Sequence, residues 1–304
     1  MKNVLLIGAS GFIGHEVARQ LSTSGVRLRL LVHRSQPDIQ TKHGIELLHG
    51  GLQSFDWKAL DDDPPDTIFH AARISGKNML SRYWAGTRGY RANNRLLDWA
   101  RSLGEPPHIV FTSGSLVYGS RGDIPADEHA TVQPISFQRS YMPAEMPFLK
   151  KSGQPKNRIS IVRPSWVYGS DSWFRQFFYR IMKQDGVVPQ YGTGENFMSL
   201  VNLRDCASMI IEVARQSQGG TIYNLYVGEP MRQSEFCGTI SRLTGKPVKI
   251  LSYRWLHAKY GRAVAEALTF SLIVKSVHPL ITEFKSSSHD HSKGLRETLN
   301  SFEE

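Results

Sequence analysis

Short runs of apolar, β-forming residues alternate with amphipathic stretches along the first half of the chain. Such runs are typical of strands buried on both faces, and the stretches between them have the spacing of surface helices. The pattern predicts a helix at 90–103 and strands at 4–7, 28–32, 45–48, 66–70, 108–112 and 159–162. Strands that alternate with helices favour a doubly wound, parallel α/β sheet with right-handed crossovers.

The pattern changes after Gly169, where aromatic residues and single glycines become frequent. Helices are predicted here at 173–182, 204–215, 234–243 and 255–268, and strands at 197–201 and 221–226. We expect a smaller α+β lid that covers the carboxyl ends of the strands and holds the substrate. From Lys285 onward the sequence is polar, so residues 286–304 are expected to form a loosely ordered tail.

Three glycines separate the first predicted strand from the first predicted helix, in Gly8-Ala-Ser-Gly11-Phe-Ile-Gly14. A strand, a glycine turn and a helix in this order form the fingerprint of a dinucleotide site. Gly8 lets the chain turn off the strand, Gly11 lets a pyrophosphate approach, and Gly14 lets the helix pack on the sheet. The helix N-terminus offers free N–H groups to the phosphates. The residues expected to contact the cofactor in this turn are Gly8, Ser10, Gly11, Phe12, Ile13 and Gly14.

Composition and charge narrow the range of partners. With 304 residues and 40% hydrophobic content the chain can bury a large core, and no apolar run is long enough to span a bilayer. The net charge is +10, but Lys and Arg are scattered without a basic tail or a helix stripe, which favours anionic small ligands over nucleic acid. Cys206 and Cys237 lie far apart, so we expect a reducing, cytoplasmic setting and neither a disulfide nor a metal site. His289 and His291 lie in the polar tail, where solvation is favoured over metal binding.

Five motifs resemble those of the extended short-chain dehydrogenase/reductase superfamily, which contains NAD(P)-dependent epimerases, dehydratases and reductases. In the family's order they are GASGFIG (8–14), FHAA (69–72), VFTSGSLVYG (110–119), VRPSWVYG (162–169) and VNLRDCA (201–207). The resemblance covers nearly the whole chain. It implies a Rossmann-type domain at 1–169, with parts of 195–228, that binds NADP(H) or NAD(H), and a substrate lid formed mostly by 170–285. It also implies further cofactor contacts at Ala71, Ala72, Arg73, Thr112, Ser113, Tyr141, Pro164, Ser165 and Val167, and substrate contacts at Trp166 and Tyr168.

The end of the second predicted strand indicates which dinucleotide is bound. Relatives that prefer NAD place an acid there, but Arg34 lies twenty residues after Gly14, beside His33, and no acid precedes Asp38. A guanidinium can donate two hydrogen bonds to a 2′-phosphate, which favours NADP(H) over NAD(H). Relatives carry Gly-Asp-Leu after the third strand, whereas this chain has Gly50-Gly51-Leu52, so one side-chain contact with the adenine is lost.

The candidate catalytic residues depart from the family's Ser-Tyr-Lys pattern. In active relatives a Ser or Thr stands four residues before the tyrosine of the VYG motif, but that position is Gly114, flanked by Ser113 and Ser115. Tyr141 is the candidate acid, with Ser113 or Ser115 as the hydroxyl that polarises the substrate oxygen. The residue four positions after Tyr141 is lysine in relatives and Glu145 here. An anionic neighbour disfavours the phenolate that a proton shuttle must form.

Two further positions bear on the substrate and on the assembly. Many sugar-nucleotide enzymes of the superfamily carry an arginine seven residues before the aspartate that matches Asp205; this position is Met198, which makes a nucleotide sugar the less favoured substrate. Asp205 itself is expected to cap its helix. A four-helix homodimer contact is common in the superfamily, but Pro147 is expected to break or kink one of those helices.

These observations lead to three functional hypotheses. The favoured one is an NADP(H)-dependent oxidoreductase, epimerase or dehydratase of altered mechanism that acts on a small molecule. The second is a non-catalytic NADP(H)-binding sensor or regulator that has lost the proton shuttle. The third is a redox-neutral enzyme on the same fold. A homodimer is considered, and neither nucleic acid nor a membrane is an expected partner.

Overall fold

The computed structural model describes residues 1–33, 37–39, 45–76, 78–154 and 156–303, which form two compact units. Unit 1 comprises Met1–Ser113, Ser140–Arg163 and Ala207–Tyr223, and unit 2 comprises Gly114–Arg139, Pro164–Cys206 and Asn224–Glu304. Each unit has a hydrophobic core of its own. Within the described ranges, no helix is both long enough and apolar enough to cross a membrane.

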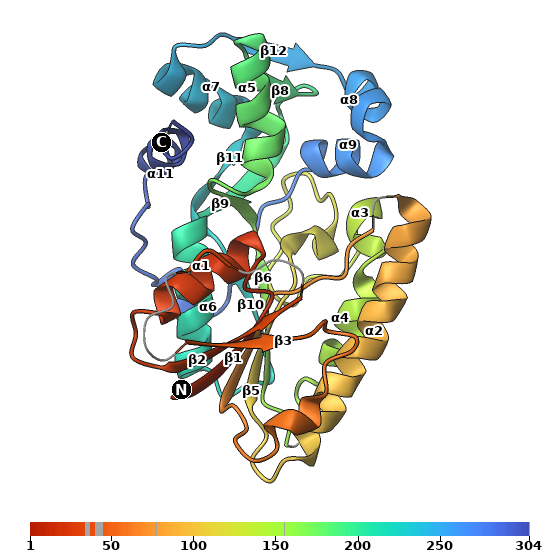
Figure 1. Ribbon diagram of the computed structural model, residues 1–304. Helices are drawn as coiled ribbons and strands as arrows, with labels where there is room; N and C mark the ends of the chain where they lie inside the picture. Colours follow the sequence, from red (N-terminus) through yellow and green to blue (C-terminus); the bar gives the residue numbers. More distant parts are fainter. Residues whose placement is uncertain (34–36, 40–44, 77, 155, 304) are drawn as a thin grey trace. The chain divides into compact units, whose positions relative to one another are not determined.

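A seven-stranded sheet forms the centre of unit 1, apart from the last residues of β6 and β10 (Figure 1). The strand order is β10-β6-β5-β4-β1-β2-β3, and every pairing from β3 to β6 is parallel. Because β1 pairs with both β2 and β4, the chain changes its direction across the sheet at this point. This arrangement confirms the predicted doubly wound, Rossmann-type sheet. The strands are β1 (Asn3–Ile7), β2 (Arg27–Val32), β3 (Ile45–His49), β4 (Thr67–His70), β5 (His108–Thr112), β6 (Ile159–Pro164) and β10 (Thr221–Leu225).

Helices cover both faces of this sheet (Figure 1). On one face lie α1 (Phe12–Leu21) and α6 (Leu203–Gln216), and on the other lie α2 (Met79–Ser102) and α4 (Met142–Lys151). Phe148 of α4 stacks on Phe111 of β5 with ring centroids 4.0 Å apart, and both belong to a core with Ile68 and Leu96. The short helix η1 (Trp57–Leu60) adds Trp57 to the same core.

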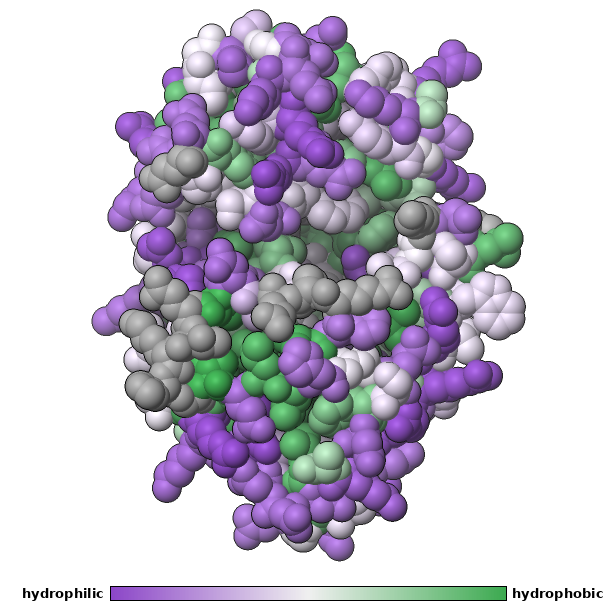
Figure 2. All heavy atoms as spheres, in the orientation of Figure 1, coloured by the Kyte–Doolittle hydropathy of each residue, from purple (hydrophilic) through white to green (hydrophobic). Residues whose placement is uncertain are grey.

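Helix α2 begins at Met79 and not at Tyr90, where the hydrophobic pattern predicted its start. Asn78 caps the helix: its side chain accepts the amide of Ser81, and the Ser81 hydroxyl accepts the amide of Asn78. The first turns were missed because they expose Tyr83 and Trp84 to solvent, against the rule that aromatic residues mark the buried face. Figure 2 shows this end of α2 at the right edge of the molecule, where hydrophobic (green) and intermediate (pale) side chains are exposed beside hydrophilic (purple) ones.

Glycine allows α2 to pack closely against α4. A Cβ atom at Gly86 would lie 2.3 Å from the carbonyl oxygen of Ser140, and one at Gly89 would lie 2.7 Å from the Cβ of Ala144. Helix α4 runs from Met142 to Lys151 with Pro147 inside it, so the proline, which was predicted to break or kink the helix, does not break it. Packing on α2 and on the sheet stabilises α4 despite the hydrogen bond that a proline cannot donate.

Unit 2 contains two small sheets, one with the order β11-β9-β7 and one that pairs β12 with β8. Its strands are β7 (Trp166–Tyr168), β8 (Val188–Tyr191), β9 (Phe197–Asn202), β11 (Val227–Arg232) and β12 (Val248–Leu251). Its helices are η2 (Ser115–Tyr118), α3 (Ser136–Arg139), the π-helical turn η3 (Arg175–Tyr179), α5 (Arg180–Asp185), α7 (Gln233–Thr244), α8 (Tyr253–Tyr260), α9 (Arg262–Thr269), α10 (Pro279–Thr282) and α11 (His291–Asn300). Its core is rich in aromatic rings, among them Phe174, Phe178 and Phe236. The single helix predicted at 255–268 is two helices, because Gly261, with a φ of +80°, separates α8 from α9.

The C-terminal segment is not the loosely ordered tail that its polarity predicted. Residues His291–Asn300 form α11, which Asp290 caps and which buries Leu295 and Leu299 in the core of unit 2. Only two leucines four residues apart mark this buried face, and that pattern is too short to recognise in a polar segment. His291 is buried, not solvated as predicted: its ring contacts the Tyr168 hydroxyl at 3.2 Å and the Val227 carbonyl at 3.1 Å.

Candidate functional site

The glycine turn after β1 is required by packing within unit 1. Gly8 has a φ of +98°, and a Cβ atom there would lie 2.6 Å from the backbone nitrogen of Ala72. A Cβ atom at Gly14 would lie 2.1 Å from the carbonyl oxygen of Gly8. The loop after β4 is held to β1 by a hydrogen bond from the Ala71 amide to the Ile7 carbonyl. The first and third glycines therefore let β1, α1 and the Ala71–Ala72 backbone approach one another closely.

The N-terminus of α1 has the properties that an anionic ligand requires. Gly11 is the N-cap, with no side chain to accept the first amides of the helix, and no acid lies in the first turn. Ser10 and Gly11 are exposed, while Phe12 and Ile13 are half-buried. The geometry fits the diphosphate of a dinucleotide, because free N–H groups and the positive end of the helix dipole face an accessible turn.

The residues predicted to choose between NADP(H) and NAD(H) are only partly described. Arg34 lies outside the described residues, whereas His33 is exposed at the end of β2. A Cβ atom at Gly51 would lie 3.1 Å from the His33 ring, so the histidine lies against the glycine at which the resemblance leads one to expect aspartate. Because Gly51 has no Cβ atom, it leaves room for the His33 ring.

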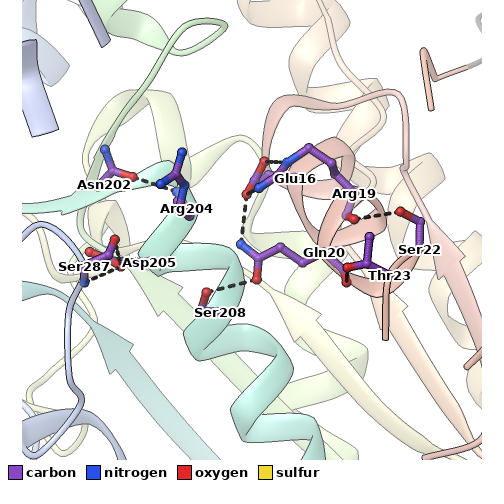
Figure 3. Close-up of polar contacts among 10 residues, drawn as sticks. All are labelled: Glu16, Arg19, Gln20, Ser22, Thr23, Asn202, Arg204, Asp205, Ser208 and Ser287. Atoms are coloured by element: carbon purple, nitrogen blue, oxygen red, sulfur yellow. Dashed lines mark hydrogen bonds and ion pairs between the residues drawn. The ribbon is translucent and has the colours of Figure 1, made fainter. Parts of the chain in front are cut away.

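A hydrogen-bond network holds α1 against α6 within unit 1 (Figure 3). The Glu16 carboxylate accepts two hydrogen bonds from Arg19 and one from Gln20. The Gln20 side chain accepts a hydrogen bond of 2.9 Å from Ser208 on α6. These contacts fix the helix whose first turn would receive the phosphates.

Glu145 lies in the first turn of α4 and is 2% exposed. The Ser113 hydroxyl, which directly follows β5, donates a hydrogen bond of 2.6 Å to one carboxylate oxygen of Glu145. The Arg163 guanidinium, on β6 and 1% exposed, donates one of 3.2 Å to the other oxygen. Four residues after Tyr141, where the resemblance leads one to expect lysine, this chain thus has a buried carboxylate between a hydroxyl and a guanidinium.

Tyr141 lies one turn before Glu145 and is almost fully buried. Its hydroxyl accepts a hydrogen bond of 3.4 Å from the Gly76 amide, and the Arg73 guanidinium lies 4.5 Å from the centre of its ring. A cation at the ring face interacts favourably with the aromatic quadrupole. Ser113 and Tyr141 were both predicted to contribute a catalytic hydroxyl. In the structure the Ser113 hydroxyl donates to the Glu145 carboxylate, whereas the Tyr141 hydroxyl accepts from the Gly76 amide.

His70, at the end of β4, links the sheet to the helices that carry these residues. Its Nε2 lies 2.9 Å from the Asn93 side-chain oxygen on α2, and the Asn93 amide donates a hydrogen bond of 2.7 Å to the Ala144 carbonyl on α4. Burial between Phe111 and Phe148 lowers the pKa of His70 to about 4. Burial likewise lowers the pKa of His108, at the start of β5, to about 4. Both imidazoles are therefore neutral in the folded protein near pH 7.

These two histidines predict that unit 1 loses stability on mild acidification. In the unfolded chain a histidine binds its proton below about pH 6.5, but in the folded chain it does so only near pH 4. Each neutral histidine contributes up to about 3 kcal/mol to the free energy of unfolding. This contribution is fully present above pH 6.5 and is lost as the pH falls toward 4. Urea denaturation at a series of pH values would measure this slope.

The matched variants for this measurement are His70→Gln and His49→Gln. Glutamine at 70 can keep the hydrogen bond with Asn93 but does not titrate, so the loss between pH 6.5 and 4 is expected to shrink. His49 is exposed on β3, and its replacement is expected to leave the slope unchanged. An unchanged slope in His70→Gln would show that His70 does not carry the effect.

Several predicted site residues belong to unit 2. Ser115 is buried in η2, and Tyr118 donates a hydrogen bond of 2.8 Å to Asn224. Pro164 is buried at the end of β6, and Trp166 and Val167 are half-buried on β7.

Ser165 has a buried Oγ atom that has no hydrogen-bond partner in the described part of the chain, although its amide donates a hydrogen bond to the Leu225 carbonyl. The Tyr168 hydroxyl, predicted to meet the substrate, is buried against His291 and Gly294 instead.

The N-terminal turn of α6 also differs from the prediction. Asn202 accepts the Arg204 amide at 2.8 Å, so Asn202 and not Asp205 provides the cap (Figure 3). Asp205 accepts hydrogen bonds from the hydroxyls of Ser286 and Ser287 and from the Ser287 amide. Its carboxylate therefore ties the C-terminal segment to unit 2.

Arg163 is the site residue that the sequence argument did not assign. It was present in the VRPSWVYG motif, and it is the one charged residue in the buried strand Ile159–Pro164. An arginine in such a strand requires an acidic partner, and this requirement is the signal that the sequence offers; the structure shows that the partner is Glu145. Thr112, which was assigned to the cofactor, is half-buried at the end of β5 beside Val162.

Comparisons with known proteins agree with this arrangement. The NAD dependent epimerase/dehydratase family matches residues 4–225 of the chain. An N-acetyl-α-D-glucosaminyl-diphospho-ditrans,octacis-undecaprenol 4-epimerase from Escherichia coli O157:H7 is 24% identical over 246 residues, which cover 75% of this chain and 68% of that protein.

Two solved structures have the same fold. The UDP-N-acetylglucosamine 4-epimerase from Methanobrevibacter ruminantium M1, in complex with UDP-N-acetylmuramic acid, superposes with a TM-score of 0.82 at 18% identity over 99% of this chain and 98% of that chain. The human epimerase family protein SDR39U1, with NADPH, has a TM-score of 0.79 at 18% identity over 99% of each chain. With the doubly wound sheet, the glycine turn and a family match over most of its length, this chain belongs to the NAD-dependent epimerase/dehydratase family.

Proposed function

We propose that this chain is an NADP(H)-dependent enzyme in which Ser113, backed by Glu145, moves the proton that the tyrosine and lysine move in typical relatives. The observation that carries the proposal is the hydrogen bond of 2.6 Å from the Ser113 hydroxyl to the Glu145 carboxylate. A hydroxyl that donates to a carboxylate can accept a proton from a substrate hydroxyl while it passes its own proton to the carboxylate. Glu145, as a proton acceptor, would thus take the place of the lysine that typical relatives carry.

The cofactor fits the turn between β1 and α1. Ser10 and Gly11 present an open backbone, and α1 offers uncapped amides with no acid in its first turn to repel phosphate. NADPH is bound by one neighbouring structure and NAD by others. The arginine that follows His33 in the sequence favours NADP(H), with NAD(H) as the alternative. When bound, the nicotinamide would accept or return a hydride.

The chain's own residues would supply the rest of the reaction. Arg163 donates to the oxygen of Glu145 that Ser113 does not use, so the carboxylate is held in one orientation. For alcohol oxidation, the substrate hydroxyl would give its proton to the Ser113 oxygen while Ser113 gives its own proton to Glu145, and the oxidised cofactor, when bound, would supply the acceptor for the hydride of the carbinol carbon. Tyr141, with Arg73 over its ring, is the alternative acid.

The proposed substrate is a small hydroxyl or carbonyl compound. Two neighbouring structures hold the nucleotide sugars UDP-N-acetylmuramic acid and UDP-glucose, but Met198, at the position where many sugar-nucleotide enzymes carry arginine, is buried in unit 2 and offers no charge to a diphosphate. The buried and unpartnered Ser165 Oγ is a polar atom that a ligand could satisfy. A nucleotide sugar is therefore the competing substrate in the test.

Replacing Ser113 with alanine is expected to lower turnover by roughly a hundredfold or more, the usual contribution of a positioned acid–base group. The affinity for NADPH is expected to fall much less than turnover, because Ser113 is one of many expected cofactor contacts and is not part of the glycine turn. Turnover is followed by NADPH absorbance over a panel of small aldehydes, ketones and alcohols, with UDP-N-acetylglucosamine included. NADPH and NADH affinities are measured by fluorescence titration.

Ser102→Ala removes a hydroxyl that donates to the Trp99 carbonyl within α2 and serves as the matched control. Full activity in Ser113→Ala together with loss of activity in Tyr141→Phe would show that Tyr141, and not Ser113, moves the proton. Tight NADPH binding with no turnover on any compound would favour the sensor hypothesis. Failure to bind either dinucleotide would overturn the proposal as a whole.

A further inference from the structure

Strand β12, in the two-stranded sheet of unit 2 (Figure 1), has an open outer edge. It pairs in parallel with β8, and no other described strand joins this sheet. The carbonyls of Pro247 and Leu251 accept hydrogen bonds from backbone amides at the two ends of β8. Since successive residues of a parallel strand direct their N–H and C=O groups to opposite sides, Val248 and Ile250 direct theirs away from β8. These groups are the unpaired donors and acceptors that an edge strand presents.

The opposite edge of the same sheet is closed by α7. The Tyr191 amide of β8 donates a hydrogen bond of 2.6 Å to the side-chain oxygen of Gln233, which is 1% exposed. Pro189 has no N–H, and its carbonyl accepts a hydrogen bond of 3.4 Å from the Cys237 thiol. Of these two strands, which the structure describes in full, β12 is therefore the one with an edge that a further strand can reach.

Apolar side chains are exposed along this open edge. Ile250 is 66% exposed and Val248 is 39% exposed, and because they are two residues apart they lie on one face of the strand. Lys249 is exposed on the other face. Tyr253, in the first turn of α8, is 43% exposed. An accessible strand edge with apolar side chains is a place where another strand can pair, and its charges select which strand does so.

The charges around β12 are all of one sign. Residues 236–265, from α7 to α9, include no acid, and β8, the strand paired with β12, carries no charge. The acid that precedes β8 is Asp185, at the end of α5. Six cations lie in this segment, all but the second exposed, and none belongs to an ion pair among the described residues: Arg242, Lys246, Lys249, Arg254, Lys259 and Arg262.

This charge distribution decides between the partners that an open strand edge can take. A second copy that paired edge to edge would bring residues 236–265 against themselves, and this segment holds cations before and after β12 but no acid to match them in either direction. Nucleic acid would match the cations but would leave the backbone groups of β12 and the Ile250 side chain without partners. An extended peptide with acidic side chains matches the backbone groups and the cations together.

We propose that the outer edge of β12 binds an extended, acidic peptide segment of another protein, which pairs with it as a third strand of the sheet. The backbone of the peptide pairs with the N–H and C=O groups of Val248 and Ile250. Side chains alternate between the two faces of a sheet, so apolar side chains of the peptide pack beside Ile250 and acidic ones lie beside Lys249. This interaction does not rest on the proposed catalytic function.

The test is fluorescence anisotropy of the full chain with a fluorescein-labelled peptide in which glutamate alternates with valine. Saturable binding is expected, and it is expected to weaken as salt is raised. The same peptide with lysine in place of glutamate is expected not to bind. Two further peptides carry N-methyl groups on the glutamate amides or on the valine amides. Because a strand pairs with one neighbour through alternate residues, one of these two is expected to bind at least tenfold more weakly than the unmodified peptide.

Variants of β12 test the edge from the side of the protein. Ile250→Pro removes the outward amide, and an edge strand tolerates proline where its N–H faces solvent; peptide affinity is expected to fall at least tenfold. Lys249→Glu with Arg254→Glu is expected to lower it to a similar extent. Circular dichroism checks that each variant folds. If Ile250→Pro does not fold, the charge variant and the methylated peptides still test the proposal.

Unit 2 also offers matched controls. Val132→Pro places proline at a loop residue that is 38% exposed, and Lys293→Glu with Arg296→Glu makes the same change of net charge on exposed positions of α11. Neither is expected to reduce peptide binding. The proposal is overturned if the wild type does not bind the acidic peptide, if both methylated peptides bind as tightly as the unmodified one, or if the controls weaken binding as much as the β12 variants. It is also overturned if the β12 variants leave peptide binding unchanged and instead abolish a dimer in light scattering or binding to a single-stranded oligonucleotide.

Discussion

Replacing Glu145 with lysine, the residue that relatives carry at this position, is expected to destabilise unit 1 by about 3–5 kcal/mol or more. Glu145 and Arg163 are 2% and 1% exposed, so neither charge can be solvated by water when its partner is lost. Lysine would remove the acceptor for Ser113 and would place a second cation beside Arg163. Since a domain has only about 5–15 kcal/mol of net stability, much of it would be lost. Urea denaturation of purified variants measures the difference.

The control is the same type of substitution on the neighbouring helix. Asp98 forms an ion pair with Lys151 but is 69% exposed, so Asp98→Lys is expected to cost no more than about 1 kcal/mol. Replacing both buried partners, in Glu145→Leu with Arg163→Met, is expected to be milder than Glu145→Leu alone, because no unpaired charge remains. Equal effects of Glu145→Lys and Asp98→Lys would contradict the buried pair that the structure shows.

The size of this effect bears on how the family's site has changed. A chain that only lost a lysine would show an ordinary surface or apolar residue at 145. Here the position is occupied by a carboxylate that has two donors, from β5 and from β6. Because Glu145 is paired with Arg163, we expect that a single substitution to lysine would not give a stable site.

The parts of the site that sequence could predict are those made by neighbouring residues. Gly8, Gly11 and Gly14 lie within one turn, so the spacing of the residues determines which atoms meet. The doubly wound, parallel sheet followed from the alternation of apolar runs with amphipathic stretches, because parallel strands with helical crossovers have few allowed arrangements. The structure confirms this sheet and the close packing at Gly8 and Gly14, whereas the contacts of the turn with a cofactor stay a prediction.

The parts that sequence could not predict depend on contacts between distant segments. Glu145 and Arg163 are brought together only when α4 packs beside β6, and no local spacing records that contact. The start of α2 was missed because the aromatic residues of its first turns, Tyr83 and Trp84, are exposed to solvent. Helix α11 was missed because its buried face consists of few residues. In each case the structure depends on packing between distant segments, which the local sequence pattern does not record.

Replacing Gly14 with alanine is expected to destabilise unit 1 by about 3 kcal/mol and to weaken NADPH binding by roughly a hundredfold. The added Cβ would lie 2.1 Å from the Gly8 carbonyl oxygen and 2.8 Å from its carbonyl carbon. Both are backbone atoms of the turn, so the clash can be relieved only by moving α1 away from β1. Gly104→Ala is the control, because a Cβ atom there meets nothing within 4 Å; its effect is expected to stay below about 1 kcal/mol.

Gly11→Ala separates the packing role of the turn from its role toward a ligand. A Cβ atom at Gly11 would lie 3.3 Å from the Gly8 carbonyl oxygen, a contact that a small shift can relieve, and the residue is exposed. Its stability is therefore expected to change by less than about 1 kcal/mol, whereas NADPH binding falls if the pyrophosphate lies against this backbone. A variant that keeps both stability and NADPH affinity would show that no ligand approaches Gly11. One that loses both in proportion would show that this glycine, like Gly14, serves the packing of α1 alone.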